Sequence, residues 1–235
     1  MPELDKHDSP LPTTTVKWRF PSVHPEGRKF AVGAAAITAF AFLLHLKLIA
    51  WLLVGLTIWV AAFFRDPIRT TPRGDRLIVA PADGLVTLIT RVPPPRELAG
   101  PDMLEDGEFT RVSIFMSVFD VHINRAPIAG TVTRVKYHPG DFLPAWDEKA
   151  SLQNEQNAVT VEGGGTAVEF KQIAGLIARR IVFNKREGDP VAAGERVGMI
   201  KFGSRVDVFV PASVQVRVKN GDRVQGGLSV LAERT

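Results

Sequence analysis

The sequence predicts a mainly β fold that follows an N-terminal α-helical membrane hairpin. Two observations carry this prediction. An almost uninterrupted apolar run extends from Phe30 to Phe64, and short strand-like segments punctuated by glycine and proline fill residues 65–235. A polar segment, residues 1–29, precedes both and contains five prolines before residue 26, so we expect a flexible arm there.

Composition narrows the function classes. The chain has 235 residues, enough for one large or two small domains, and its 29 basic and 25 acidic residues give a net charge of +4. That charge is too small to indicate nucleic acid by itself, and it equally suits an anionic membrane surface. With no cysteine and five scattered histidines, the sequence predicts neither disulfides nor a metal site.

The apolar run is too long for one upright span. A single helix over Phe30–Phe64 would extend about 50 Å at 1.5 Å per residue, whereas the hydrocarbon core of a bilayer is about 30 Å thick. The polar His45-Leu46-Lys47 interruption favours two legs, Phe30–Leu44 and Leu48–Phe64. Such a hairpin either barely crosses the membrane or dips in and returns.

Positive charge flanks the hairpin on both sides, at Arg28 and Lys29 before it and at Arg65 after it. The positive-inside rule then places both flanks, and the domain that follows, on the cytoplasmic side of the cell membrane. A signal peptide is disfavoured because the apolar part is too long and no clear cleavage site precedes Arg65. A buried core hairpin remains the alternative.

Residues 65–235 read as short strands. The segment Arg111–Val118 alternates apolar and polar residues, which is typical of a half-buried strand, and Leu143–Gln156 alone looks irregular or weakly helical. The other predicted strands are Arg76–Ala80, Leu85–Val92, Thr131–Tyr137, Ala158–Val161, Thr166–Lys171, Leu176–Phe183, Val197–Phe202, Val206–Val210, Val214–Lys219 and Leu228–Ala232.

Two turn motifs occur twice. Gly188–Gly194 is echoed by Gly221–Gly227, and Pro81–Val86 by Pro127–Val132; each echo is a turn signal followed by a strand. Paired turns of this kind resemble the barrel-sandwich folds of biotinyl and lipoyl carriers, in which short strands wrap around a quasi-twofold axis. We therefore expect a barrel-sandwich-like β domain.

Three polar residues in strand–turn contexts could carry chemistry: Asp83, His122 and Ser204. Together they allow a hydroxyl to be activated by an imidazole that a carboxylate orients. Plainer interpretations exist, because Asp83 suits an ordinary turn, His122 could pair with Asp120, and Gly203–Ser204 could be a simple strand connection. No Gly-x-Ser-x-Gly elbow is present, which disfavours an ordinary serine hydrolase.

Several motifs follow one another in a fixed order. They are Phe64-Arg65-Asp66-Pro67, Pro81-Ala82-Asp83-Gly84, Phe119–Pro127, Tyr137-His138-Pro139-Gly140-Asp141, Asn154-Glu155-Gln156-Asn157 and Phe202-Gly203-Ser204. In this order and spacing they resemble the phosphatidylserine decarboxylase proenzymes of the short bacterial type. The resemblance runs from about residue 30 to the end of the chain.

This resemblance implies that the chain is a zymogen. Ser204 would attack the Gly203 carbonyl, and the resulting ester would eliminate and hydrolyse to leave a covalent pyruvoyl cofactor in place of Ser204. Glycine at 203 allows the strained backbone that such an attack needs. The products would be a β chain, residues 1–203, and an α chain, residues 204–235, which remain together as a heterodimer. Asp83 and His122 would take part in self-cleavage or decarboxylation.

The resemblance also implies a reaction in phospholipid biosynthesis. The pyruvoyl ketone would form a Schiff base with the amine of phosphatidylserine in an anionic membrane, and loss of CO2 would give phosphatidylethanolamine. His122 is the first candidate to protonate the carbanion. Such a lyase explains the apolar hairpin through its lipid substrate.

The sequence departs from the family pattern twice. Arg125 stands where longer members carry a second histidine, so the base for self-cleavage stays open. Arg205 follows Gly203-Ser204 where serine or threonine is commoner, and Arg205 and Arg125 are candidates to bind the substrate phosphate.

Two other functions remain open. One is a non-enzymatic, membrane-anchored β module like a carrier domain, which the paired turns would suit. The other is a pyruvoyl decarboxylase of a soluble amino acid, which would leave the apolar hairpin unexplained.

Overall fold

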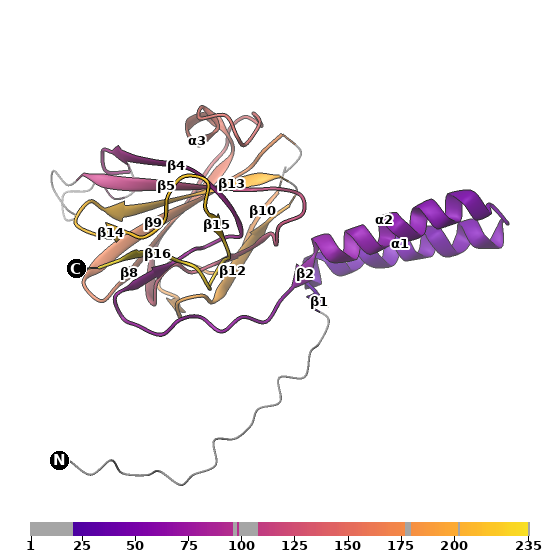
Figure 1. The fold of residues 1–235 in the computed structure, drawn as a ribbon, viewed down its shortest axis with the longest axis horizontal. Coiled ribbons are helices and arrows are strands. Elements are labelled where there is room, and N and C mark those ends of the chain that lie inside the picture. Colours follow the sequence, from indigo (N-terminus) through magenta and orange to yellow (C-terminus); the bar gives the residue numbers. More distant parts are fainter. Residues whose placement is uncertain (1–20, 96–97, 99–107, 177–179, 202, 235) are drawn as a thin grey trace, which may run out of the picture.

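A computed structural model gives the fold and describes residues 21–95, 98, 108–176, 180–201 and 203–234. A pair of helices projects from one end of a β domain (Figure 1). Most of the predicted polar arm, residues 1–20, lies outside the described residues. The domain after the hairpin is mainly β, as the sequence predicted, and the structure shows that its paired strands run antiparallel.

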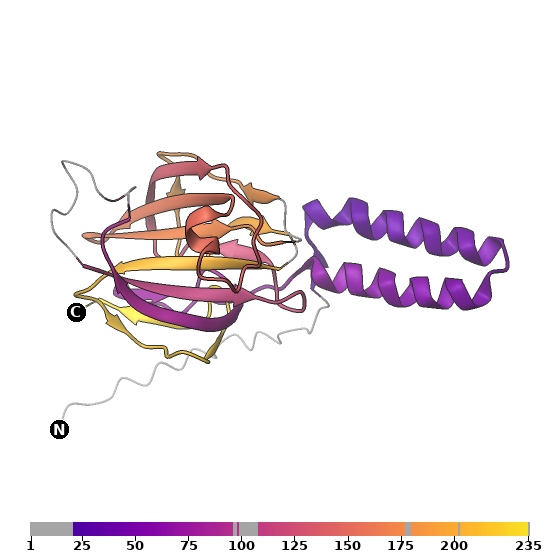
Figure 2. The ribbon, with the colours of Figure 1, turned by 90° about the horizontal axis from the view of Figure 1, so that it is seen from above.

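The helices α1 (Pro25–Leu43) and α2 (Lys47–Phe63) run antiparallel and lie side by side (Figure 2). The hydroxyls of Thr38 and Thr57 are hydrogen-bonded across them at 2.9 Å. The first helix begins at Pro25, within the segment predicted as a flexible arm. The reason is local: proline suits the first helical position, and His24 Nδ1 accepts a hydrogen bond from the Glu26 amide.

Many large apolar side chains on this hairpin are exposed. Leu43 and Leu48, near the turn between the helices, are 75% and 78% exposed. Across the described part of the chain, none of the helices is both long and apolar enough to cross a membrane.

A two-stranded ribbon closes the base of the hairpin, where β1 (Ser22–Val23) pairs with β2 (Arg65–Asp66). The remaining elements are β3 (Leu77–Val79), β4 (Gly84–Val92), β5 (Phe109–Met116), β6 (Ile123–Arg125), β7 (Gly130–His138), α3 (Ala150–Gln153), β8 (Gln156–Gly163), β9 (Thr166–Ile173), β10 (Ile181–Phe183), β11 (Pro190–Val191), β12 (Arg196–Ile200), β13 (Ser204–Pro211), β14 (Gln215–Val216), β15 (Arg223–Val224) and β16 (Val230–Glu233).

Most of the predicted strands are present with their ends shifted by a few residues. Two are much shorter than predicted: among the described residues of Leu176–Phe183 only 181–183 form a strand, and Val214–Lys219 retains only Gln215–Val216. The segment predicted as irregular or weakly helical holds a single short helix, α3.

The largest sheet has eight strands in the order β11-β7-β8-β9-β13-β5-β4-β15 and curls into a half-barrel (Figure 2). The order is symmetrical about its centre: β11 corresponds to β15, β7 to β4, β8 to β5 and β9 to β13. The repeated turns occupy equivalent places. Gly188 before β11 has φ 91° and Gly221 before β15 has φ 92°, in the left-handed region that glycine adopts readily.

Strand β13 lies inside this sheet, between β9 and β5. Its residues alternate between the two faces. Val206, Val208 and Val210 contribute to the main apolar core, whereas Phe209 belongs to a smaller cluster on the other face. Strand β12, which precedes it, belongs to a different sheet with β10 and β6. The Gly203–Ser204 bond therefore lies where the chain passes from one sheet to another.

Candidate active site

The end of strand β5 brings the three predicted site residues into one region. Ser204, the first residue of β13, pairs with Met116 of β5. Asp83 precedes β4, which pairs with β5 on its other side. Neighbouring strands are about 4.8 Å apart, so the backbones that carry Asp83 and Ser204 are roughly 10 Å apart. His122 follows the turn after β5, and its Nε2 is 3.1 Å from the Ser117 carbonyl.

Ser204 is fully buried, and its hydroxyl lies 3.5 Å from the Met116 sulfur, a weak acceptor. Gly203 before it has φ 58°, a left-handed conformation that disfavours a side chain, although a Cβ there would meet no atom of the described residues within 4 Å. The Gly203 carbonyl oxygen lies against Gly175, because a Cβ added to Gly175 would overlap this oxygen. Glycine is favoured at position 203 because of its left-handed backbone conformation. Glycine is favoured at position 175 because a Cβ there would overlap the Gly203 oxygen.

His122 is buried with one ring nitrogen unpartnered. A carbonyl can only accept a hydrogen bond, so the contact to Ser117 places the ring proton on Nε2 and leaves a lone pair on Nδ1. Among the described residues, no group is hydrogen-bonded to this Nδ1. Burial lowers the pKa of His122 to about 4, so the imidazole is neutral at physiological pH. A neutral imidazole nitrogen with an available lone pair can accept a proton from a neighbouring group.

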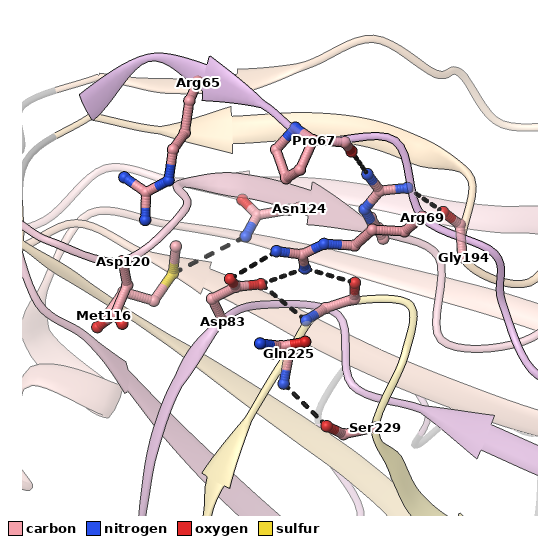
Figure 3. Close-up of polar contacts among 12 residues, drawn as sticks. Arg65, Pro67, Arg69, Asp83, Met116, Asp120, Asn124, Gly194, Gln225 and Ser229 are labelled. Atoms are coloured by element: carbon pink, nitrogen blue, oxygen red, sulfur yellow. Dashed lines mark hydrogen bonds and ion pairs between the residues drawn. The ribbon is translucent and has the colours of Figure 1, made fainter. Parts of the chain in front are cut away.

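Asp83 forms an ion pair with Arg69, a residue that the sequence analysis did not single out. The Arg69 guanidinium donates to both carboxylate oxygens, with Nη2 2.7 Å from Oδ2, and the Gly226 amide donates to Oδ1 at 2.8 Å. Figure 3 shows Arg69 facing Asp83 directly. The carboxylate is therefore held in a fixed orientation from two sides.

The fold's internal symmetry argues that Asp83 is more than a turn residue. Ala129 occupies the equivalent place before Gly130 in the other half of the sheet. Both glycines approach the backbone of the neighbouring strand so closely that a Cβ would overlap a carbonyl oxygen, that of Phe115 for Gly84 and that of Glu162 for Gly130. The same turn thus forms without a carboxylate.

Among the described residues, none of Asp83, His122 and Ser204 is hydrogen-bonded to another. The three groups surround one strand end but remain engaged with other partners. An Asp–His–Ser relay would require small side-chain movements from this arrangement.

Arg205 lies on the outer face of β13 and is almost fully buried. It donates to the Asp207 carboxylate at 2.6 Å and to the Ser113 hydroxyl at 2.6 Å, and Ser151 donates to the other Asp207 oxygen. Ser204, one residue earlier, alternates to the opposite face. The geometry therefore does not favour Arg205 as a phosphate ligand; its ion pair with Asp207, which accepts from Ser151, helps to fasten the short helix α3 to the sheet.

Arg125 is also buried, at 4% exposure, and donates to the backbone carbonyls of Gly194 and Pro67 at 2.8 and 3.1 Å. Burial and the neighbouring guanidiniums of Arg196 and Arg69 lower its pKa to about 10, so it stays cationic at neutral pH. Arg125 thus joins the loop that contains Pro67 to the loop that contains Gly194. With its donors engaged in this way, the geometry does not favour phosphate binding by Arg125.

A chain of buried amides adjoins the site. Asn157 donates to Gln172 at 3.0 Å, Gln172 donates to Asn124 at 2.9 Å, and Asn124 lies 3.9 Å from the Met116 sulfur that also contacts Ser204. The sequence analysis quoted Asn157 within a motif but assigned no role to it. Through the Met116 sulfur, this chain of amides is linked to the Ser204 hydroxyl and helps to fix the side chains around it.

These features define a class of protein. A buried serine after a left-handed glycine, a neutral imidazole and a fixed carboxylate suit chemistry at the preceding peptide carbonyl. Groups of His, Asp and Glu that could hold a metal are absent from the described residues. The serine, the imidazole and the carboxylate are side chains that enzymes use for nucleophilic and acid–base catalysis.

Comparison with known proteins identifies the family. The profile of the family described as "Phosphatidylserine decarboxylase" matches residues 56–232. Relatives named "Phosphatidylserine decarboxylase proenzyme" include proteins of Novosphingobium aromaticivorans, 56% identical over 93% of this chain and 89% of the relative, and of Zymomonas mobilis, 54% identical with the same coverage. A third, from Erythrobacter litoralis, is 51% identical over 92% of this chain and 89% of its own length.

The chain belongs to the phosphatidylserine decarboxylase family. It is therefore an enzyme of the carboxy-lyase class, and decarboxylation of phosphatidylserine is the activity of its family. The non-enzymatic carrier-like module and the decarboxylase of a soluble amino acid are accordingly not supported.

Proposed function

We propose that this chain decarboxylates phosphatidylserine to phosphatidylethanolamine and CO2 with a pyruvoyl group that it makes from its own Ser204. The observation that carries the proposal is the buried, unpartnered Nδ1 of His122 at the same strand end as Ser204. The relatives named proenzymes support a chain that must be processed before it is active.

Self-cleavage would begin when the Ser204 hydroxyl attacks the Gly203 carbonyl carbon and its proton passes to His122 Nδ1. The peptide C–N bond breaks, which leaves an ester and a free amine on Ser204. Removal of the Ser204 Cα proton then expels the Gly203 carboxylate from Cβ. Water hydrolyses the remaining enamine through its imine tautomer, releases ammonia and leaves a pyruvoyl group at residue 204.

The surroundings of Ser204 fit such a group. A pyruvoyl group supplies an electrophilic carbonyl that can bond to an amine and accept the electron pair released with CO2. The buried site limits access of water, and Arg69 and the Gly226 amide hold the carboxylate of Asp83 in a fixed orientation. His122, neutral at physiological pH, can take up and return a proton there.

The fragment 204–235 would stay bound after cleavage. Its strands pair mostly with strands of the larger fragment: β13 with β5 and β9, β15 with β4, and β16 with β3. We propose that the resulting two-chain β domain, with its symmetrical sheet order, is a barrel-sandwich-like catalytic domain that follows the arm and the hairpin.

The helical hairpin would attach the chain to an anionic membrane and keep the β domain on the cytoplasmic side of the cell membrane. Its exposed apolar side chains support this, since soluble proteins rarely leave so many in one patch. A groove of about 360 Å³ between the helices is lined mainly by apolar residues and bordered by Lys29, which suits an acyl chain with its phosphate nearby.

Replacement of Ser204 tests the proposal. Ser204→Ala should give a single uncut chain on a denaturing gel and no release of CO2 from phosphatidylserine, whereas the wild-type chain should give a fragment that begins at residue 204 and is blocked by a pyruvoyl group, as read by intact mass. Ser229→Ala, in the same fragment, serves as the matched control and should be processed normally. A wild-type chain that remains uncut yet is active would refute the proposal.

Attachment to the membrane is tested separately. Changing Leu43 and Leu48 to serine should weaken binding to vesicles that contain phosphatidylserine and leave self-cleavage intact. Equal binding by this double variant and the wild type would contradict the proposed role of the hairpin.

A further inference from the structure

The base of the hairpin packs against the segment that carries His122. A small apolar cluster, separate from the main core, joins the two parts. It consists of Phe63, Phe64, Val121, Ile123 and Met199. Two of its members, Val121 and Ile123, flank His122 in the sequence, so the same packing that seats the hairpin also seats the backbone of this histidine.

Phe63 contacts the imidazole itself. The ring centroids of Phe63 and His122 are 4.4 Å apart, and the ring planes are inclined by only 29°. Both residues are buried, at 1% and 0% exposure. The phenyl ring of α2 therefore covers one face of the histidine that has the unpartnered Nδ1.

A second contact joins the hairpin to the strand that leads to Gly203. Lys201 forms an ion pair with Glu26 of α1 at 2.8 Å, and its Nζ lies 5.6 Å from the centroid of the Phe30 ring. Lys201 precedes Gly203 by two residues. The hairpin base thus contacts both the histidine and the approach to the Gly203–Ser204 bond.

We infer that Phe63 is a positioning residue for His122: it keeps water from one face of the imidazole and fixes the plane in which Nδ1 lies. The inference rests on the proposed role of His122 in the reaction at Ser204. It makes the hairpin base part of the catalytic centre, with membrane attachment assigned to the exposed apolar surface farther along the helices.

The charged groups around His122 determine how its pKa should respond when Phe63 is replaced. Burial is the largest cause and lowers the pKa of His122; the backbone of Ser117 and the charge of Asp120 raise it, and Arg65 of β2 lowers it. Asp120 is itself 3.2 Å from Arg223 of β15. Truncating Phe63 removes burial and leaves these charges in place, so the pKa of His122 should rise from about 4 toward the 6.5 of an exposed imidazole.

A titration of the uncut protein tests this without reference to cleavage. In full-length Ser204→Ala protein in detergent micelles, NMR should show the His122 imidazole titrating near pH 4, with His122→Gln used to assign its signal. Adding Phe63→Ala should raise this pKa by at least one unit. Adding Phe109→Ala, which truncates an equally buried phenylalanine in another apolar cluster, should not change it.

The inference is overturned if Phe63→Ala leaves the His122 pKa unchanged, or if Phe109→Ala raises it equally. Should Phe63→Ala fail to fold, Phe63→Leu retains most of the apolar volume without the flat ring. It should give a smaller rise, and an unchanged pKa there also overturns the inference.

Self-cleavage supplies a second readout in chains that retain Ser204. A rise of two units in the pKa of His122 lowers the neutral fraction at pH 5 about tenfold, so Phe63→Ala should be processed about tenfold more slowly at pH 5 and much less affected at pH 8. A uniform slowing at both pH values would show that Phe63 does not control the burial of the imidazole, and would contradict the inference. If the wild-type chain is never cut, the proposed function fails, while the NMR titration still decides the role of Phe63.

Discussion

Substituting Gly175 by alanine should block self-cleavage by displacing the carbonyl group that Ser204 would attack. A Cβ at residue 175 would lie 2.2 Å from the Gly203 oxygen and 3.3 Å from its carbonyl carbon. An ordinary van der Waals contact begins near 3.4 Å, so the carbonyl or the Gly175 backbone must move by about 1 Å. The other near neighbour of this Cβ is the methyl group of Ala145 at 3.2 Å, which has no rotatable side chain that could move aside.

The size of the effect follows from the geometry that intramolecular attack requires. A misplacement of about 1 Å at a reacting centre can cost roughly 100-fold in rate. Overpacking of this kind also destabilises a fold by about 1–3 kcal/mol. We therefore expect Gly175→Ala to be processed at least 100-fold more slowly, while it still unfolds cooperatively.

The assay is a time course of newly translated protein on a denaturing gel, with circular dichroism melting to monitor the fold. Gly55→Ala is the control, because a Cβ there meets nothing within 4 Å. Adding hydroxylamine, which cleaves esters, locates the block: Gly175→Ala should yield no fragments because the ester never forms. Processing at the wild-type rate, or release of fragments by hydroxylamine, would refute the steric argument.

Three further predictions concern the same region. In Ser204→Ala protein, His122 alone should lower the stability in urea by about 3 kcal/mol between pH 6.5 and pH 4, because its folded-state pKa, about 4, lies below the unfolded value and the unfolded chain binds the extra proton. His122→Gln should remove this part of the acid-induced loss, and an undiminished loss in the variant would contradict the burial of the imidazole. Arg69→Lys keeps the charge but loses the two-pronged contact with Asp83, so processing on gels should slow about tenfold, and an unchanged rate would count against the contact. Asp207→Asn weakens a buried ion pair and should destabilise the protein by about 3–5 kcal/mol in urea; a cost below 1 kcal/mol would contradict the assigned role of that pair.

Much of the fold could be predicted because its signals are local. The alternation in Arg111–Val118 and the repeated turns before residues 191 and 224 depend on neighbours along the chain. The early start of α1 was missed because the apolar run begins at Phe30, whereas the helix is initiated by His24 and Pro25 through capping, which hydrophobicity does not report.

The site could be predicted only in part. Asp83, His122 and Ser204 stand in motifs, and the structure gathers them around the end of β5. Arg69 and Phe63 act through contacts with residues 14 and 59 positions away, and no local pattern marks either. Arg205 looked free to bind phosphate because its burial depends on a loop folding over the outer face of the sheet.

The interior position of β13 has a consequence for the lifetime of the mature enzyme. Its eight residues pair along their whole length with β5, and five of them also pair with β9. Cleavage before Ser204 would place this strand on the short fragment, where it remains paired between β5 and β9 of the longer fragment. The uncut chain could refold by itself, but the cut protein would have to reassemble from two molecules and reopen a sheet. Heat inactivation of the mature form should therefore be irreversible at low concentration. The lifetime of the mature enzyme is then governed by the rate at which it unfolds, and the precursor has only one opportunity to form the native sheet before cleavage.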